Sequence, residues 1–150
     1  MHQTRPGVIG AGPLQVGLHY NPAGQLAEVV MPEVVPTGLE PGHLRDIIAQ
    51  LKQMPLAEPE GGPFTQKVWK KLAGIRWGTA KTYLEIATAL GNPKASRAVG
   101  NACGTNRLLL VIPCHRVIAS AGMGGFRAGL EWKAKLLELE SESEQVVTAL

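Results

Sequence analysis

Near the amino end of the chain, apolar and polar residues alternate with a period of two. Residues 14–20 have the sequence Leu-Gln-Val-Gly-Leu-His-Tyr, and residues 26–30 form a second short apolar segment. This alternation is typical of a strand that buries one face. The Asn-Pro-Ala-Gly sequence at residues 21–24 is a turn signal. The pattern therefore predicts a β-hairpin over residues 14–30.

After the hairpin the spacing becomes helical, because apolar residues recur every three or four positions. Residues 44–51 predict one short amphipathic helix. A second helix is predicted over residues 66–73, with Thr65 as its amino-terminal cap. The inward-facing side chains of this second helix are expected to be Val68, Trp69 and Leu72.

Two further helices are predicted in close succession, over residues 82–90 and 94–102. The Gly-Asn-Pro sequence at residues 91–93 ends the first of them. Its apolar positions are Leu84, Ile86, Ala87 and Leu90. The second is rich in alanine, serine and glycine. Two short helices joined by a tight glycine-containing turn indicate a helix-turn-helix.

A last helix is predicted over residues 130–141. Its apolar positions include Leu130, Ala134, Leu136 and Leu137. Glu140 follows Leu136 by four residues and Leu137 by three, so it shares part of their face. The pattern alone favours a position at the solvent-exposed rim, because an unpaired buried charge is costly. A buried carboxylate paired with a cation is the alternative.

The domain organisation is predicted from composition. Residues 55–63 contain three prolines, two glycines and two glutamates, which is the composition of a linker. We therefore place a boundary near residue 62, between an amino-terminal domain of residues 1–62 and a carboxy-terminal domain of residues 63–150. A chain of 150 residues is long enough for two small domains.

The distribution of charge changes sign at the same place. The formal net charge is −3 for residues 1–63, +10 for residues 64–135 and −4 for residues 136–150. A segment this basic suits a polyanionic partner. A solvated basic face without a partner is the alternative.

Composition also favours a cytoplasmic protein with no membrane partner. The sequence contains no run of about 18 apolar residues that could cross a bilayer, and residues 1–6 lack the apolar segment of a signal peptide. The only cysteines, Cys103 and Cys114, fit a reducing compartment.

Candidate chemistry is concentrated at Cys114 and His115, which directly follow Pro113 at the end of an apolar run. Cysteine attacks as a thiolate, and its ordinary pKa near ~8.5 means that it needs local help to ionise at neutral pH. A neighbouring histidine can remove the proton or stabilise the anion. Without further context, a buried cysteine that only packs is the alternative.

The motifs together resemble the O6-alkylguanine-DNA alkyltransferase family, the methylated-DNA–protein-cysteine methyltransferases. The resemblance covers residues 63–140 almost continuously. Its blocks occur in the family's order and spacing: FTQKVW at 64–69, GTAKTY at 78–83 with IA at 86–87, GNPKASRAVG at 91–100, Asn106 with PCHRV at 113–117, GFRAGL at 125–130 and KLLELE at 135–140.

The resemblance implies an α+β fold. A small amino-terminal sheet domain, an abbreviated ribonuclease-H-like unit with one covering helix, would precede a mostly helical carboxy-terminal domain with the helix-turn-helix. Two positions depart from the family: Arg107 follows Asn106 where proline is frequent, and Phe126 replaces a frequent tyrosine. The zinc site of some relatives is not supported, because His2, His19 and His43 are isolated.

The resemblance also implies a reaction, the irreversible transfer of an alkyl group from O6 of guanine in duplex DNA to the sulfur of Cys114. His115, acting through a water, would take the thiol proton, and Glu140 would orient His115. This role makes the buried position of Glu140 the favoured one. Asn106 would fix the active-site turn. Tyr83 would donate a proton toward guanine N3 as the base leaves.

Two groups of residues are expected to contact the substrate. Arg97 would fill the gap that the flipped nucleotide leaves, and small residues would let the recognition helix approach the minor groove. The expected DNA contacts are Thr82, Lys94, Ala95, Ser96, Arg97, Gly100 and Arg116. The expected pocket residues are Tyr83, Val117, Phe126 and Arg127.

The protein is expected to act once, because a thioether has no easy leaving path. It is also expected to be a monomer without a cofactor or metal. O6-alkylguanine in duplex DNA is the expected substrate, with O4-alkylthymine left open. Two other functions compete: a lesion sensor like the alkyltransferase-like proteins, which lack the acceptor cysteine, and a sequence-specific helix-turn-helix regulator.

Overall fold

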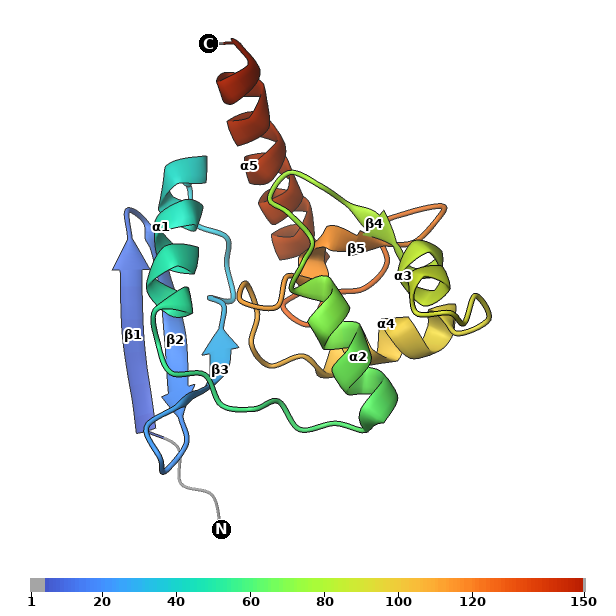
Figure 1. Cartoon of the computed structure of the whole chain (residues 1–150). Helices are drawn as coiled ribbons and strands as arrows, with labels where there is room; N and C mark the ends of the chain where they lie inside the picture. The colour runs from blue at the N-terminus through green and yellow to red at the C-terminus, as the bar shows by residue number, and fades with distance from the viewer. Residues whose placement is uncertain (1–4, 150) are drawn as a thin grey trace.

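A computed structural model describes the backbone of residues 5–149 and the side chains of residues 7–142. It has a small antiparallel sheet with one helix packed on it, next to a mostly helical region (Figure 1). This arrangement confirms the mixed α and β fold expected from the sequence. Residues 1–4, which belong to the segment used to judge a leader peptide, lie outside the described residues.

The sheet has strand order β1 (Arg5–Ala11), β2 (Leu14–Tyr20) and β3 (Leu26–Val30). Strands β2 and β3 form the predicted hairpin, and their bounds agree with the prediction. Strand β1 was not predicted. Its Arg-Pro-Gly-Val-Ile-Gly-Ala sequence has weak strand propensity, and it forms a strand because it pairs along its whole length with β2.

Helix α1 (Pro41–Lys52) covers the sheet and confirms the predicted amphipathic helix. Leucine and isoleucine side chains from its inner face pack against the alternate apolar residues of β2. The fully buried members of this core are Leu14, Val16, Leu18, Leu44, Ile47 and Leu51. Residues 53–62 then lead to the helical region without a helix or strand of their own, although Leu26 and the Pro55–Ala57 stretch exchange two backbone hydrogen bonds.

The helical region contains α2 (Pro63–Leu72), α3 (Tyr83–Ala89), α4 (Ser96–Thr105) and α5 (Leu130–Ala149). Helices α3 and α4 are joined by a short turn and form the predicted helix-turn-helix (Figure 1). Helix α2 packs against α4, and the indole N–H of Trp69 donates a hydrogen bond to the Ala102 carbonyl at 2.9 Å.

Three short elements connect this region to the Pro-Cys-His-Arg-Val motif of residues 113–117. Strand β4 (Lys81–Thr82) pairs in parallel with β5 (Val117–Ile118). A single 3-10 turn, η1 (Cys114–Arg116), directly precedes β5. The pairing of β4 and β5 therefore brings the start of α3 next to the end of the cysteine turn.

Two helix starts differ from the prediction. Helix α2 begins at Pro63 rather than at residue 66, because proline is well suited to the first helical position. Thr65 therefore lies inside the helix and is not its cap. Helix α4 begins at Ser96, two residues later than predicted, and continues to Thr105.

Helix α5 differs more, because it extends to Ala149 and buries another face than the one expected. Leu130 is 52% exposed and Ala134 is also exposed, whereas Leu136 is fully buried. Among the described side chains of this helix, residues 130–142, the buried ones are Trp132, Lys133, Leu136, Leu139 and Glu140. Leu84, another expected core position, is 47% exposed on α3.

The sheet and the helical region are joined by direct contacts. The indole N–H of Trp132 donates to the Pro32 carbonyl at 2.7 Å, and the Val29 N–H donates to the Arg107 carbonyl at 2.9 Å. Between residues 5 and 149, no helix is long and apolar enough to cross a membrane.

The buried face of α5 is testable with a matched pair of substitutions. Leu136→Ala should lower the free energy of unfolding by about 2–5 kcal/mol, because it empties a fully buried site. Leu130→Ala, the same change on the exposed side of the helix, should cost less than about 0.5 kcal/mol. Urea unfolding followed by circular dichroism measures both. Equal losses would contradict the assignment of the buried face.

Candidate active site

The cysteine turn is held in place by Asn106, which follows α4. The Asn106 side-chain amide donates to the Ile112 carbonyl at 2.8 Å and to the Cys114 sulfur at 3.2 Å. Its side-chain oxygen accepts from the Leu108 N–H at 3.0 Å. Asn106 is itself buried. It therefore closes the loop between α4 and η1 and lies against the sulfur atom.

Cys114 is buried and protonated at neutral pH. Burial raises the pKa of the Cys114 thiol, and the Asn106 hydrogen bond and the Lys133 charge only partly offset this effect. The second cysteine, Cys103, is also buried, and its burial raises the pKa of Cys103 to about 12. It makes no side-chain hydrogen bond within the described residues. Cys114 is thus the better candidate for a nucleophile, because its sulfur accepts a hydrogen bond from Asn106.

Glu140 lies at the centre of a buried network that joins α5 to η1. Its Oε2 atom is 2.8 Å from His115 Nε2, and both carboxylate oxygens accept hydrogen bonds from the Arg116 guanidinium, at 2.8 and 2.9 Å. The Gly78 N–H donates to Oε1 at 3.3 Å. Only 1% of Glu140 is exposed. The buried-partner interpretation of Glu140 is therefore the one that the contacts support, and the exposed-rim interpretation is wrong.

The charges of this network follow from its contacts. Burial alone would raise the pKa of Glu140, but the hydrogen bonds and charges of His115 and Arg116 lower it to about 2. Burial lowers the pKa of His115, and the Glu140 hydrogen bond and charge do not fully offset it. At neutral pH the carboxylate is therefore ionised and the imidazole neutral.

The tautomer of His115 is then fixed by Glu140. A carboxylate can only accept a hydrogen bond, so the imidazole proton lies on Nε2 and the lone pair lies on Nδ1. His115 Nδ1 is buried and makes no hydrogen bond to any described residue. The ring therefore presents a basic nitrogen on the side away from Glu140.

Tyr83 begins α3 and borders the same region. Burial raises the pKa of the Tyr83 hydroxyl, with the nearby Cys103 as the next cause, so the phenol stays protonated at neutral pH. Gly124 allows this position, because a Cβ at residue 124 would lie 2.5 Å from the Tyr83 hydroxyl oxygen, and the φ of Gly124 is +71°. The 119–129 loop and α3 can therefore approach closely only with glycine at residue 124.

The sequence analysis did not identify Lys133, which is fully buried on α5. Its ammonium group donates to the Val117 carbonyl at 2.6 Å and to the Gly125 carbonyl at 2.9 Å, and lies 5.8 Å from the Tyr83 ring centroid. Lys133 precedes Leu136 by three residues and Glu140 by seven. This spacing places Lys133 on the same face of the helix as Leu136 and Glu140, and it is the signal in the sequence that could have identified Lys133.

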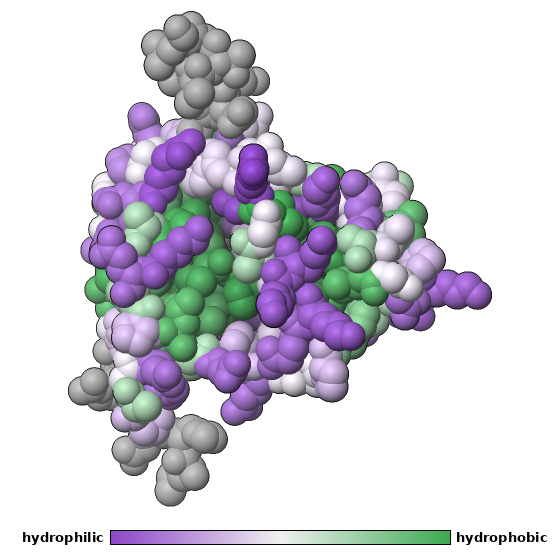
Figure 2. All heavy atoms as spheres, viewed as in Figure 1, coloured by the Kyte–Doolittle hydropathy of each residue, from purple (hydrophilic) through white to green (hydrophobic). Residues whose placement is uncertain are grey.

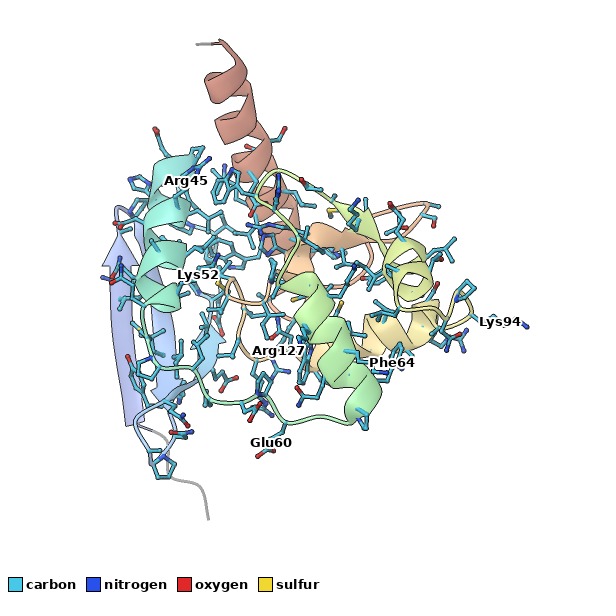
Figure 3. The ribbon with its side chains drawn as sticks, in the orientation of Figure 1. Arg45, Lys52, Glu60, Phe64, Lys94 and Arg127 are labelled. Carbon is cyan, nitrogen blue, oxygen red and sulfur yellow. The ribbon has the colours of Figure 1, made fainter. Side chains whose placement is uncertain are left out.

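The residues expected to contact DNA differ in solvent exposure and in their location relative to α3 and α4. Lys94 and Arg97 are exposed in and after the turn between α3 and α4, where Figure 3 shows Lys94 pointing outward. Ala95, Ser96 and Gly100 are partly exposed on or beside α4. The Thr82 hydroxyl accepts from the Glu85 N–H at 3.0 Å and caps α3.

Arg116 requires a correction. It is buried, and all three of its guanidinium nitrogens donate inward, two to Glu140 and the third to the Ile75 carbonyl at 2.7 Å. An arginine held in this way cannot also contact a DNA phosphate. Its observed side-chain partner is the Glu140 carboxylate.

The expected pocket residues surround η1 at different depths. Val117 is fully buried, and the partly buried Phe126 ring is in a T-shaped arrangement with the His115 ring, at 6.2 Å between ring centroids. Arg127 is exposed, 3.8 Å from the Glu28 carboxylate of the sheet region. Among the residues that the structure describes, no three histidine, cysteine, aspartate or glutamate side chains are grouped to hold a metal.

Comparisons with known proteins identify the family of the chain. The family described as 6-O-methylguanine DNA methyltransferase, DNA binding domain, matches residues 63–142. The chain is 49% identical over 88 residues to a probable methylated-DNA–protein-cysteine methyltransferase of Acanthamoeba polyphaga mimivirus, which is 59% of each protein. The crystal structure of Mycobacterium tuberculosis O6-methylguanine methyltransferase superimposes with a TM-score of 0.70 at 30% identity, covering 93% of this chain and 94% of that one. Mycobacterium tuberculosis OGT in complex with DNA gives a TM-score of 0.69 at 32% identity, covering 90% and 91%.

A buried cysteine, histidine and glutamate lie beside a helix-turn-helix in this chain. The chain belongs to the 6-O-methylguanine DNA methyltransferase family. It spans about three fifths of the length of the viral relative and about half that of other curated relatives.

The ionised state of Glu140 has a consequence for acid stability. Its pKa of about 2 lies below the ordinary value of 4.5, so in acid the unfolded chain binds a proton that the folded chain does not. The stability that this carboxylate contributes is therefore complete above about pH 5 and is lost as the pH falls toward 2. Glu140→Gln should cost about 3–5 kcal/mol near neutral pH, because it leaves Arg116 buried without its counter-charge.

Urea unfolding at about pH 6 and about pH 3 measures this effect. The difference in unfolding free energy between wild type and Glu140→Gln should shrink at the lower pH. Glu138→Gln, at an exposed carboxylate 3.3 Å from Lys135, is the matched control. Its unfolding free energy should equal that of wild type at both pH values. A Glu140→Gln protein with undiminished acid sensitivity would contradict the assignment.

Proposed function

We propose that this chain repairs DNA by transferring an alkyl group from O6 of guanine to Cys114, once per molecule. The observation that carries the proposal is the arrangement of Cys114, Asn106, His115 and Glu140 in one buried site next to a helix-turn-helix. The family membership supports the same function.

The reaction requires removal of the thiol proton, because Cys114 is a thiol in the resting protein. His115 Nδ1 is the base in this proposal, with the proton passing through a water. The imidazolium that forms is stabilised by Glu140, which is already ionised and in contact with Nε2. The thiolate then attacks the alkyl carbon, a C–S bond forms, and the C–O bond to guanine breaks.

The leaving base needs a proton, since an anionic purine is a poor leaving group. Tyr83 supplies it toward guanine N3 in this proposal. The raised pKa of the Tyr83 hydroxyl keeps the donor protonated. Lys133 is a positioning residue, because it holds the Val117 and Gly125 carbonyls that border the site.

The substrate is proposed to be duplex DNA carrying O6-alkylguanine. A base inside the helix hides its O6 carbon, so the nucleotide must leave the stack, which costs a few kcal/mol. Arg97 would enter the space that it vacates, while Lys94 would contact phosphate. The relative from Mycobacterium tuberculosis, seen in complex with DNA, supports a DNA partner for this fold. We further propose that the protein acts as a monomer without a cofactor.

Transfer to Cys114 is tested with excess duplex carrying labelled O6-methylguanine. Labelling should saturate at one methyl group per chain, on the Cys114 peptide, because a thioether does not release its carbon. Cys114→Ser should bind the duplex and accept no label, whereas Cys103→Ser should be labelled like wild type.

Labelling of Cys114→Ser at the wild-type level would falsify the proposal, as would continued turnover. Tight binding of damaged duplex by wild type with no gain in mass would instead support a lesion sensor.

The role of Arg97 is tested by comparing two substrates. Arg97→Ala should slow transfer from duplex DNA by about 10–100-fold, because each ~1.4 kcal/mol of lost stabilisation of the flipped state is tenfold. Transfer from the free modified base should be unchanged, since no stack is opened. Lys94→Ala is the control: it should weaken duplex binding but keep the single-turnover rate at saturation. A loss on both substrates would show that Arg97 acts on the chemistry or the fold.

A further inference from the structure

A cavity of about 460 Å³ lies between the two parts of the molecule, and its lining includes Pro113 and Arg116 but not Cys114. One wall is α1 of the sheet region, and the other is formed by the residues after α2 and by the chain that leads to η1. Figure 2 shows an apolar hollow on this face with hydrophilic side chains around it. Its size falls within the range of about 300–1,000 Å³ that is usual for small-molecule sites.

Part of the wall of this cavity is apolar. Ile48 from α1 and Ile75 after α2 face the same space, together with Leu110 and Val111 from the chain before η1. Leu110 has a φ of +72° and is the only described residue other than glycine with a positive φ. A leucine rarely adopts this conformation, so the wall is built from a constrained backbone rather than a loose loop.

The rim of the cavity is cationic. Arg45 and Lys52, two turns apart on α1, lie on one side (Figure 3), and Arg76 lies on the other. No acidic side chain is among the described residues that line the cavity. Within residues 7–142, neither Lys52 nor Arg76 is in an ion pair. Lys52 and Arg76 therefore place positive charge beside the apolar part of the cavity, with no acidic side chain among its described lining residues.

The indole of Trp77 extends this arrangement toward the active site. The Arg45 guanidinium stacks on the Trp77 ring at 4.4 Å from its centroid, and Arg116 lies on it at 6.0 Å. Arg116 also donates to the carbonyl of Ile75, a residue of the cavity wall. An occupant of the cavity would thus contact the segment that holds the arginine of the Glu140 network.

We propose that this cleft between α1 and the 73–77 segment binds a small organic anion with an apolar body. The apolar part would fill the space between Ile48, Ile75 and Leu110, and the anionic group, a carboxylate, sulfonate or phosphate, would lie between Lys52 and Arg76. Neither part is sufficient alone: the cations favour the charged group, and the walls favour burial of the apolar part.

A second, larger cavity provides an internal comparison. It lies between α2 and α3, has a volume of about 970 Å³, and includes Lys70 and Ala89. It also has a carboxylate, Glu85, which lies 4.0 Å from Lys81 and offsets part of its charge. The two cavities share Ile75 and Arg76, but Lys52 lines only the smaller one, and a carboxylate lines only the larger one.

The proposal is tested with 8-anilinonaphthalene-1-sulfonate, an apolar sulfonate whose fluorescence rises on binding. The wild-type protein should bind one molecule per chain saturably. The uncharged analogue N-phenyl-1-naphthylamine should bind at least about tenfold more weakly, because it lacks the anionic group. Far-UV circular dichroism and urea unfolding show that each variant is folded before it is titrated.

Two matched pairs of substitutions locate the site. Lys52→Glu should weaken sulfonate binding by about tenfold or more, and Ala49→Trp, at an exposed position of the wall, should block the cleft. Lys70→Glu and Ala89→Trp make the same changes at the other cavity and should leave the affinity within about twofold of wild type. The probe should bind protein methylated at Cys114 as it binds unmodified protein, because the cleft is outside the thiol pocket.

Three results would overturn the proposal. Sensitivity to Lys70→Glu and Ala89→Trp, but not to Lys52→Glu and Ala49→Trp, would place the probe in the other cavity. Equal affinity for the uncharged analogue would show an apolar cleft without anion recognition. Absence of saturable binding by the folded wild type would show that the cleft has no such ligand. None of these results depends on alkyl transfer.

Discussion

The buried carboxylate of Glu140 is the constraint on which the rest of the active site depends. A charge removed from water is strongly unfavourable unless its oxygens are fully hydrogen-bonded. Glu140 meets this requirement only where α5, η1 and the segment after α2 come together, through His115, Arg116 and Gly78. The requirement therefore fixes the relative positions of three segments that are far apart in the sequence, and with them the position of Cys114.

The same contact sets the protonation of the site. The permanent charge of Arg116 keeps Glu140 ionised, and the ionised carboxylate determines which nitrogen of His115 carries the proton. A second buried charge, Lys133, lies two turns earlier on the same face of α5 and holds the carbonyls of Val117 and Gly125. One helix thus carries an anion toward the cysteine turn and a cation toward the loop that borders Tyr83.

The sequence predicts those parts of the fold and the candidate site whose structure is decided by local patterns. The alternation in residues 14–20 and the glycine turn after α3 depend on neighbouring residues, and both were predicted correctly. Strand β1 could not be predicted in the same way, because its pairing with β2 and not its own sequence makes it a strand. Lys133 and Arg116 were missed or misplaced for a related reason: a basic residue usually lies in water, and only the tertiary contacts show that these two are buried with partners.

In the proposed function each molecule is consumed by its reaction, and the burial of Cys114 bears on that proposal. A thiolate exposed to solvent would react with any electrophile, and each such event would remove one molecule from use. Burial raises the pKa of the Cys114 thiol, so the resting protein stores the sulfur in its less reactive form. In the proposed reaction, His115 is a base whose accepting nitrogen, Nδ1, is already oriented by the contact of Nε2 with Glu140. Deprotonation of the thiol leads to transfer only when an alkyl carbon lies against the sulfur. Reactivity is then tied to occupancy of the site by the lesion, and selectivity follows from burial rather than from a permanently activated nucleophile.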